Sequence, residues 1–110
     1  MRNLEENMVY AIRSGEGFTQ GNTAVLWNET GKAFYVAVHG NTIARGEESM
    51  NGYGFRITAI NLCGWNTSIT RNRLRALGVP VTTKNGIPYL VGKDGKLEEL
   101  PEDGWTELFG

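Results

Sequence analysis

The side chains best suited to chemistry lie in one stretch, Trp65-Asn66-Thr67-Ser68-Ile69-Thr70-Arg71-Asn72-Arg73-Leu74-Arg75. Guanidinium groups bind phosphates and carboxylates, and hydroxyl groups add further hydrogen bonds to phosphate. An indole can stack on a base, although a tryptophan before a helix more often packs on the core. The candidate residues for binding a ligand or nucleic acid are Trp65, Thr67, Thr70, Arg71 and Arg75.

A helix over residues 67–77 must position these side chains. Asn66, Thr67 or Ser68 can cap its first turn, while Gly78 and Pro80 favour termination. At about 100° per residue, Arg71 and Arg75 fall on one polar face, whereas Arg73 lies roughly 140° from Ser68, within the apolar arc. We therefore predict that Arg71 and Arg75 face water or a partner.

Arg73 has two possible roles, because an unpaired buried charge is very costly. It either pairs structurally with a carboxylate or with carbonyls at a sheet end, or it lines a pocket for an anion. The structural pairing is the preferred interpretation.

Catalytic and metal-binding patterns are absent from the sequence. The chain has one histidine and one cysteine, which give no zinc-ligand spacing. A Cys63–His39 dyad would require the fold to bring them together, and a lone cysteine is more often a small buried residue. His39 and Asn41 fit a tight turn or a pocket wall, and no phosphate-binding loop occurs. We expect no catalytic residue, no metal site and no cofactor.

Chain length and net charge limit the classes of partner that the protein can bind. The 110 residues suit one domain, and a net charge of −1 provides no global field to attract nucleic acid. Nucleic-acid binding would therefore need a local patch. A single cysteine excludes an internal disulfide and fits a reducing compartment. No apolar run is long enough to span a membrane, so we expect no membrane association.

The apolar periodicity predicts an α+β fold in a single domain, 1–110. A short N-terminal helix at 1–15 precedes loops at 15–22 and 46–54, and an acidic tail at 101–110 is expected to dock through its aromatic residues. We expect an antiparallel sheet of about six strands, with the 67–77 helix on one face and the N-terminal helix beside it. The strands are predicted at 23–27, 33–38, 42–45, 55–60, 79–83, 87–91 and 97–100. The predicted core contains Leu26, Phe34, Val36, Val38, Phe55, Ile57, Leu74, Leu77, Val81 and Leu90.

Three segments carry a resemblance to a known group of proteins. They are His39-Gly40-Asn41-Thr42-Ile43-Ala44, Gly64-Trp65-Asn66-Thr67-Ser68-Ile69-Thr70-Arg71-Asn72-Arg73-Leu74, and Gly86-Ile87-Pro88-Tyr89-Leu90. They resemble small tailed-phage accessory proteins with an HGNxIA turn and a GWNTxxTRxRL helix start. The resemblance covers residues 22–92, and Ser68 and Ile69 stand where that pattern has Pro and Thr.

The resemblance implies a phage origin and expression in the host cytoplasm, and it supplies no catalytic residue. We therefore expect a non-enzymatic accessory protein that binds or inhibits a host protein, such as a defence factor. The alternative is a nucleic-acid- or nucleotide-binding module that uses the arginine-bearing helix. The salt dependence of binding distinguishes the two, because phosphate contacts weaken steeply as salt rises.

Overall fold

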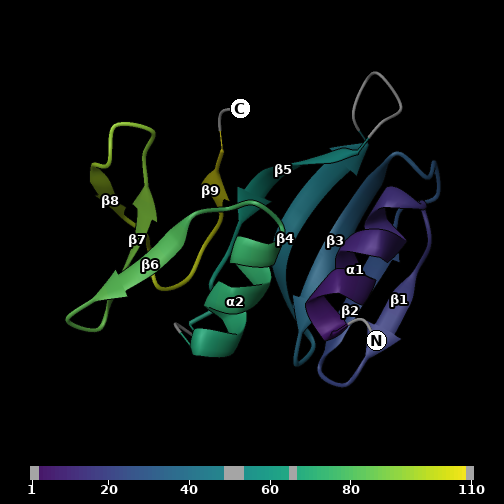
Figure 1. The fold of residues 1–110 in the computed structure, drawn as a ribbon, viewed down its shortest axis with the longest axis horizontal. Helices are drawn as coiled ribbons and strands as arrows, with labels where there is room; N and C mark the ends of the chain where they lie inside the picture. The colour runs from purple at the N-terminus through teal and green to yellow at the C-terminus, as the bar shows by residue number, and fades with distance from the viewer. Residues whose placement is uncertain (1–2, 49–53, 65–66, 109–110) are drawn as a thin grey trace.

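Two helices and nine strands make up the computed structural model, which describes residues 3–48, 54–64 and 67–108. The helices are α1 (Leu4–Arg13) and α2 (Ser68–Ala76). The strands are β1 (Phe18–Gln20), β2 (Thr23–Trp27), β3 (Ala33–Val38), β4 (Asn41–Glu48), β5 (Phe55–Ile60), β6 (Val81–Lys84), β7 (Ile87–Val91), β8 (Leu97–Glu99) and β9 (Thr106–Glu107). The predicted α+β class and antiparallel pairing are confirmed (Figure 1).

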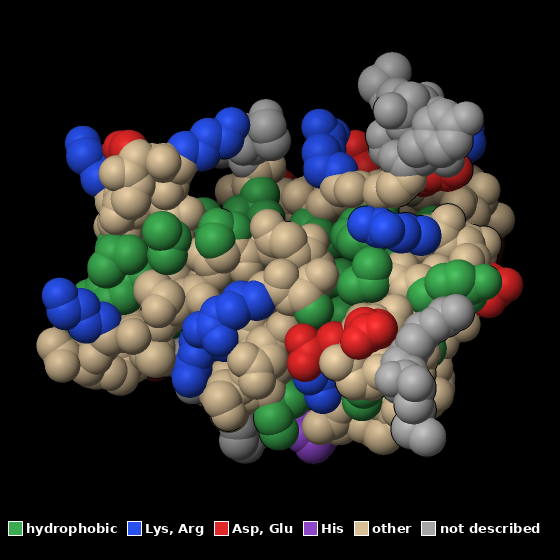
Figure 2. All heavy atoms as spheres, in the orientation of Figure 1, with side chains coloured by type: hydrophobic (Ala, Val, Ile, Leu, Met, Phe, Trp, Pro, Cys, Tyr) green, Lys and Arg blue, Asp and Glu red, His purple; other side chains and the backbone are tan. Residues whose placement is uncertain are grey.

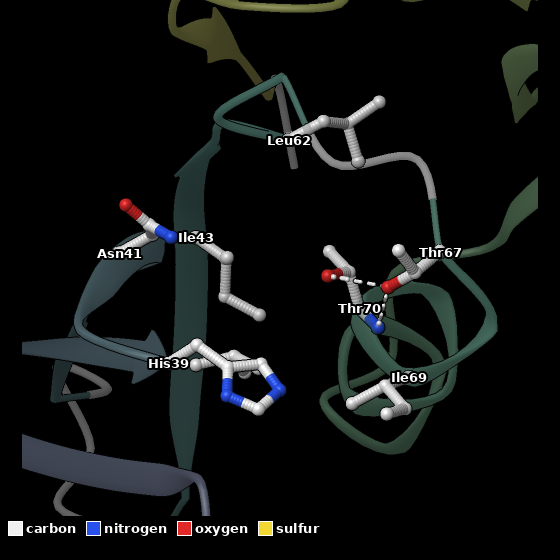
Figure 3. Close-up of a pocket in the computed structure, with 8 residues that line it drawn as sticks. His39, Asn41, Ile43, Leu62, Thr67, Ile69 and Thr70 are labelled. Atoms are coloured by element: carbon white, nitrogen blue, oxygen red, sulfur yellow. Dashed lines mark hydrogen bonds between the residues drawn. The ribbon is translucent and has the colours of Figure 1, made fainter.

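Six strands form sheet A in the order β1-β2-β3-β4-β5-β9, and each neighbouring pair is antiparallel. The β3–β4 hairpin turns at His39 and Gly40, whose φ values are 51° and 79°. Two positive φ angles in succession are what a two-residue hairpin turn requires. This turn places His39 at one end of the sheet, beside the start of α2 (Figures 1 and 3).

Both helices pack on the same face of sheet A (Figure 1), and their capping residues define where they begin. Asn3 precedes α1, and its Oδ1 accepts from the Glu6 amide at 2.8 Å. Thr67 precedes α2, and its Oγ1 accepts from the Thr70 amide at 3.2 Å. Each cap satisfies an amide that has no partner within its own helix. Gly78, with a φ of 90°, follows α2 as the sequence predicted.

Sheet B contains β6, β7 and β8 and lies on the far side of α2 from α1 (Figure 1). Asn85 and Gly86 form its first turn with φ values of 54° and 78°, as expected for an Asn-Gly hairpin. The strands predicted near 79–83, 87–91 and 97–100 therefore build a second sheet. Sheet A reaches six strands through β1 and β9 instead.

Two predicted loops are wrong in part. Residues 15–22 include β1, which pairs with β2 through Phe18↔Val25; its single apolar residue gives no alternation to detect. Residues 46–54 were predicted as a loop, but β4 continues to Glu48 because Gly46 lets it pack closely on Phe34. Residues 49–53 lie outside the described part of the chain.

The core lies between sheet A and the two helices, and it continues beneath sheet B through Val81 and Leu100. Most predicted core residues are buried, and Phe55 and Leu90 are partly buried against the same cluster. The prediction that Leu26 belongs to the core is wrong, because its side chain is 58% exposed. Side chains alternate along β2, so burying Val25 turns Leu26 to the opposite face.

The acidic tail docks along β5, as predicted. The Leu108 amide donates to the Thr58 carbonyl at 2.8 Å, and Leu108 packs against the core. The Arg45 guanidinium lies 5.2 Å from the centre of the Trp105 ring and pairs with Glu107 at 2.9 Å. The tail is thus held by β pairing, a cation–π contact and an ion pair. Phe109 lies outside the described residues.

Candidate functional site

Arg73 has a structural partner on each neighbouring element. Its Nε donates to Thr23 Oγ1 on β2 at 3.0 Å, and its Nη1 lies 3.4 Å from Glu5 Oε1 on α1. The Arg73 side chain is only 12% exposed. The preferred interpretation, a buried arginine paired with a carboxylate, is therefore supported by the geometry. Arg73 joins α1, α2 and β2 and is committed to these contacts.

Arg75 also makes contacts within the protein, although it is an exposed residue. Its Nε donates to the Val81 carbonyl at 2.8 Å, and its Nη1 donates to Asn72 Oδ1 at 3.1 Å. The guanidinium therefore ties α2 to β6, where we had predicted a side chain that faces only water or a partner. A hydrogen bond of this kind contributes about 0.5–1.5 kcal/mol to stability.

The other predicted binding residues are placed differently. Arg71 is half-buried, and Trp65 lies outside the described residues. On the face that carries the helices, Lys and Arg side chains are dispersed and do not merge into one patch (Figure 2). The arginines of α2 therefore do not form the continuous basic surface that phosphate recognition favours.

Thr67 and Thr70 instead line a pocket between the start of α2 and the β3–β4 turn (Figure 3). His39 and Asn41 line it from the opposite side, so four predicted residues meet at one site. The pocket has a volume of about 410 Å³, and its other walls are Val38, Ile43, Leu62 and Ile69. The sequence marked none of these four aliphatic residues as a wall, because apolar strand and helix positions look like ordinary core.

His39 is held in place before any ligand arrives. Its backbone amide donates to the Asn22 carbonyl at 2.8 Å, and its Nε2 lies 3.4 Å from Asn22 Nδ2. Asn22 Oδ1 accepts from the Thr23 hydroxyl at 2.9 Å, and that hydroxyl in turn accepts from Arg73. A chain of hydrogen bonds therefore runs from Arg73 to the imidazole.

This chain favours one tautomer of His39. A guanidinium only donates, so the Thr23 hydroxyl accepts from Arg73 and passes its own proton to Asn22 Oδ1. The Asn22 amide nitrogen then faces His39 as a donor, an arrangement in which Nε2 accepts. The neutral imidazole consequently carries its proton on Nδ1.

Cys63 does not form a dyad with His39. Its Sγ donates to the Thr42 carbonyl at 3.1 Å, while the histidine ring contacts Asn22. Burial raises the pKa of the Cys63 thiol above its ordinary value of 9.0, and the negative charge of Asp103 raises it further. Within the described ranges, no three His, Cys, Asp or Glu side chains gather as a metal site requires.

This raised pKa gives a testable prediction, because the thiolate is the reactive form of cysteine. Cys63 should react with iodoacetamide more slowly than a cysteine in an unstructured peptide at pH 8, and the gap should narrow as the pH rises well above 9.0. Measuring the alkylation rate across pH by mass spectrometry tests this. A rate equal to that of the peptide at pH 8 would contradict the assignment.

The same shift affects stability with a definite sign. The folded state holds the thiol proton more tightly than the unfolded state, so this contribution to stability is complete below pH 9.0. It is lost as the pH rises through the folded-state pKa. As the pH rises above 9.0, the free energy of unfolding should therefore fall more in the native protein than in the Cys63→Ser variant, which has no titrating thiol.

An acidic surface begins on β8 of sheet B and continues into the acidic tail, which is a predicted contact region. The stretch from Asp94 to Glu107 contains six acidic residues and one lysine, a net charge of −5 in a chain whose total is −1. The four central carboxylates are exposed: Glu98, Glu99, Glu102 and Asp103. We call residues 97–105 the acidic surface. Exposed Leu97 and Trp105 stand at its two ends.

The backbone of the acidic surface is fixed by contacts with the rest of the protein. The Leu100 amide donates to the Pro88 carbonyl at 3.0 Å, and the Glu102 carbonyl accepts from the Gly64 amide at 2.6 Å. The Gly104 amide donates to Asn61 Oδ1 at 3.1 Å. The carboxylates are thus carried on an ordered segment.

Comparison with protein families identifies the origin of the chain. Residues 1–106 match the model of the Kyanoviridae Gp96 protein, a phage family. The chain belongs to this family. The match includes α1 and most of the acidic tail, in addition to the central region of the chain. No curated protein and no solved structure matches the chain. Neither described helix has the length and apolar content needed to cross a membrane.

Proposed function

We propose that this phage protein is a non-enzymatic accessory protein that binds a host protein, such as a defence factor, and acts by occupying it. The observation that carries the proposal is the acidic surface, where four exposed carboxylates lie between exposed Leu97 and Trp105. Exposed apolar side chains next to charged residues offer both apolar and polar contacts to a partner protein. Complementary charge favours a host partner with a basic surface.

Two further observations support a protein partner over nucleic acid. The exposed carboxylates of the acidic surface repel phosphate groups. Arg73 and Arg75 are engaged within the protein, which leaves α2 poorly suited to contact a phosphate backbone. The alternative, nucleic-acid binding through this helix, therefore lacks a supporting surface.

The test is capture of host proteins by four matched chains. We expect the native chain to retain a specific host protein, and the Glu98→Gln/Glu99→Gln/Glu102→Gln/Asp103→Asn variant to retain at least about tenfold less of it. The control Glu16→Gln/Glu29→Gln, at two exposed carboxylates elsewhere, should capture as the native chain does. Leu97→Ala should also weaken capture, because it removes an exposed apolar side chain at one end of the acidic surface.

The same variants separate the two hypotheses. Neutralising the acidic surface should weaken binding of a basic protein but strengthen binding of nucleic acid, since it removes repulsion from phosphate. Enrichment of no host protein above background, or equal loss with the Glu16/Glu29 control, would refute the proposed site. Binding of labelled DNA or RNA by the native chain that weakens steeply as salt rises would favour the alternative.

A further inference from the structure

The pocket between α2 and the β3–β4 turn is separate from the acidic surface and invites its own interpretation. Its volume of about 410 Å³ falls within the range of small-molecule sites. Ile43 and His39 face Ile69 and Thr70 across the cavity, with Leu62 closing one end (Figure 3). A cavity with aliphatic walls and a few placed polar groups is the usual form of a small-ligand site.

We propose that this pocket binds a neutral planar heterocycle of the nucleobase or nucleoside class. Ile43 and Ile69 on opposite sides of the cavity offer apolar surface to the faces of a flat ring (Figure 3), while the lining residues His39, Asn41, Thr67 and Thr70 carry polar groups that can bond to its edge. The eight described lining residues include no Lys, Arg, Asp or Glu, so the site provides no countercharge for a polyphosphate.

His39 is the principal recognition group. Its imidazole points across the cavity toward α2 (Figure 3), and Asn22 holds both its backbone amide and its Nε2. The backbone of His39 lies in the left-handed region with a φ of 51°, where residues other than glycine are uncommon. Fixing this side chain in advance lowers the entropy that a ligand must overcome on binding.

The threonines complete the polar edge. Thr67 Oγ1 donates to Thr70 Oγ1 at 3.2 Å, so the Thr70 hydroxyl proton is left to a further acceptor. Thr70 is only 3% exposed and lies in the cavity wall. Asn41, at the start of β4, supplies an amide with both donor and acceptor atoms. A nucleobase edge also alternates donors and acceptors, whereas a hydrocarbon ring would leave these groups unsatisfied.

Titration calorimetry with adenosine, guanosine, cytidine and uridine tests the proposal, and amide NMR shifts locate the site. We expect at least one nucleoside to bind at a single site with a dissociation constant below about 1 mM, shifting the amide signals of His39 and Thr70. Indole, which is planar but lacks the acceptor edge, should bind about tenfold more weakly. The corresponding triphosphate should gain no affinity over the nucleoside.

Three variants make the test specific. Ile69→Trp places a large ring at the pocket mouth, at a side chain that is 38% exposed, and should abolish binding. Leu26→Trp adds the same ring at a 58% exposed position outside the pocket and should have no effect. His39→Asn, which tolerates the left-handed backbone, should weaken binding about tenfold through the lost imidazole contact.

Several results would overturn the inference. These are the absence of nucleoside binding at 1 mM in a chain that remains folded, equal binding by Ile69→Trp and Leu26→Trp, and equal affinity for indole. A triphosphate that binds more than about tenfold tighter than its nucleoside would refute the neutral class of ligand. Capture of the host protein depends on the acidic surface and should not change in Ile69→Trp. The two proposals can therefore fail independently.

Discussion

Replacing Gly46 with alanine should lower the free energy of unfolding by about 2–3 kcal/mol, the largest effect we expect from the addition of one methyl group. A Cβ built on Gly46 would lie 2.8 Å from the Arg56 carbonyl oxygen and 2.9 Å from Phe34 Cε1, with Phe34 Cζ closer still. Phe34 is fully buried, and the Arg56 carbonyl belongs to the adjacent strand, so neither neighbour can move away easily.

Urea denaturation of Gly46→Ala beside Gly17→Ala provides the measurement. At Gly17 the added Cβ would lie 3.7 Å from the Val25 carbonyl oxygen, an ordinary contact, so that variant should differ little from the native protein. Phe34→Leu combined with Gly46→Ala should cost less than the sum of the two single changes, because the smaller side chain relieves the overlap. Additive costs would show that Phe34 is not the obstacle.

Gly46 also shows where prediction from sequence ended. The alternating residues of β5 and the Asn-Gly turn of sheet B identified their elements, because local periodicity and turn chemistry determine them. Gly46 looked like the start of a loop, since a glycine followed by two glutamates gives no strand signal. Its role comes from Phe34, twelve residues away in sequence, and only the fold reveals that contact.

The candidate pocket was partly predictable for a similar reason. Capping chemistry selected Thr67, and the turn pattern selected His39 and Asn41, because each of these signals is local. Their convergence depends on how β3 and β4 sit against α2, which no local pattern specifies. Ile43 and Leu62 are only 1% and 2% exposed, and they also line the cavity. An apolar residue in the sequence predicts the first of these properties but not the second.

The exposed tail behaved differently. Its docking is expected from its aromatic residues, but the contacts that hold it, β9 and the Trp105–Arg45 pair, are not. Two-residue β9 has no periodicity, so its pairing with β5 could not be inferred from the sequence. Order in this segment matters for the proposed function, because an ordered acidic surface loses less entropy on binding than a disordered one.

Arg73→Ala should lower the free energy of unfolding by about 1–3 kcal/mol, the second large effect. The helical wheel placed this residue in the apolar arc, and the structure pairs it with Thr23 and Glu5. Removing the guanidinium leaves the Thr23 hydroxyl, which is only 1% exposed, without its donor. Arg73→Met, which keeps an apolar stem of similar length, should recover the packing but not the hydrogen bond.

A double-mutant cycle separates the two partners of Arg73. Coupling to Glu5 should be small, about 0.2–1 kcal/mol, because that carboxylate is 36% exposed and its 3.4 Å ion pair is open to solvent. Coupling to Thr23, measured with Thr23→Val, should be larger because both groups are shielded from water.

Arg13→Ala, at an exposed position of α1, should change stability by no more than about 0.5 kcal/mol. Equal losses for Arg73→Ala and Arg13→Ala would mean that the buried contacts of Arg73 contribute nothing. The hydrogen bonds that run from Arg73 to His39 would then not be held in place by a stabilising contact of Arg73.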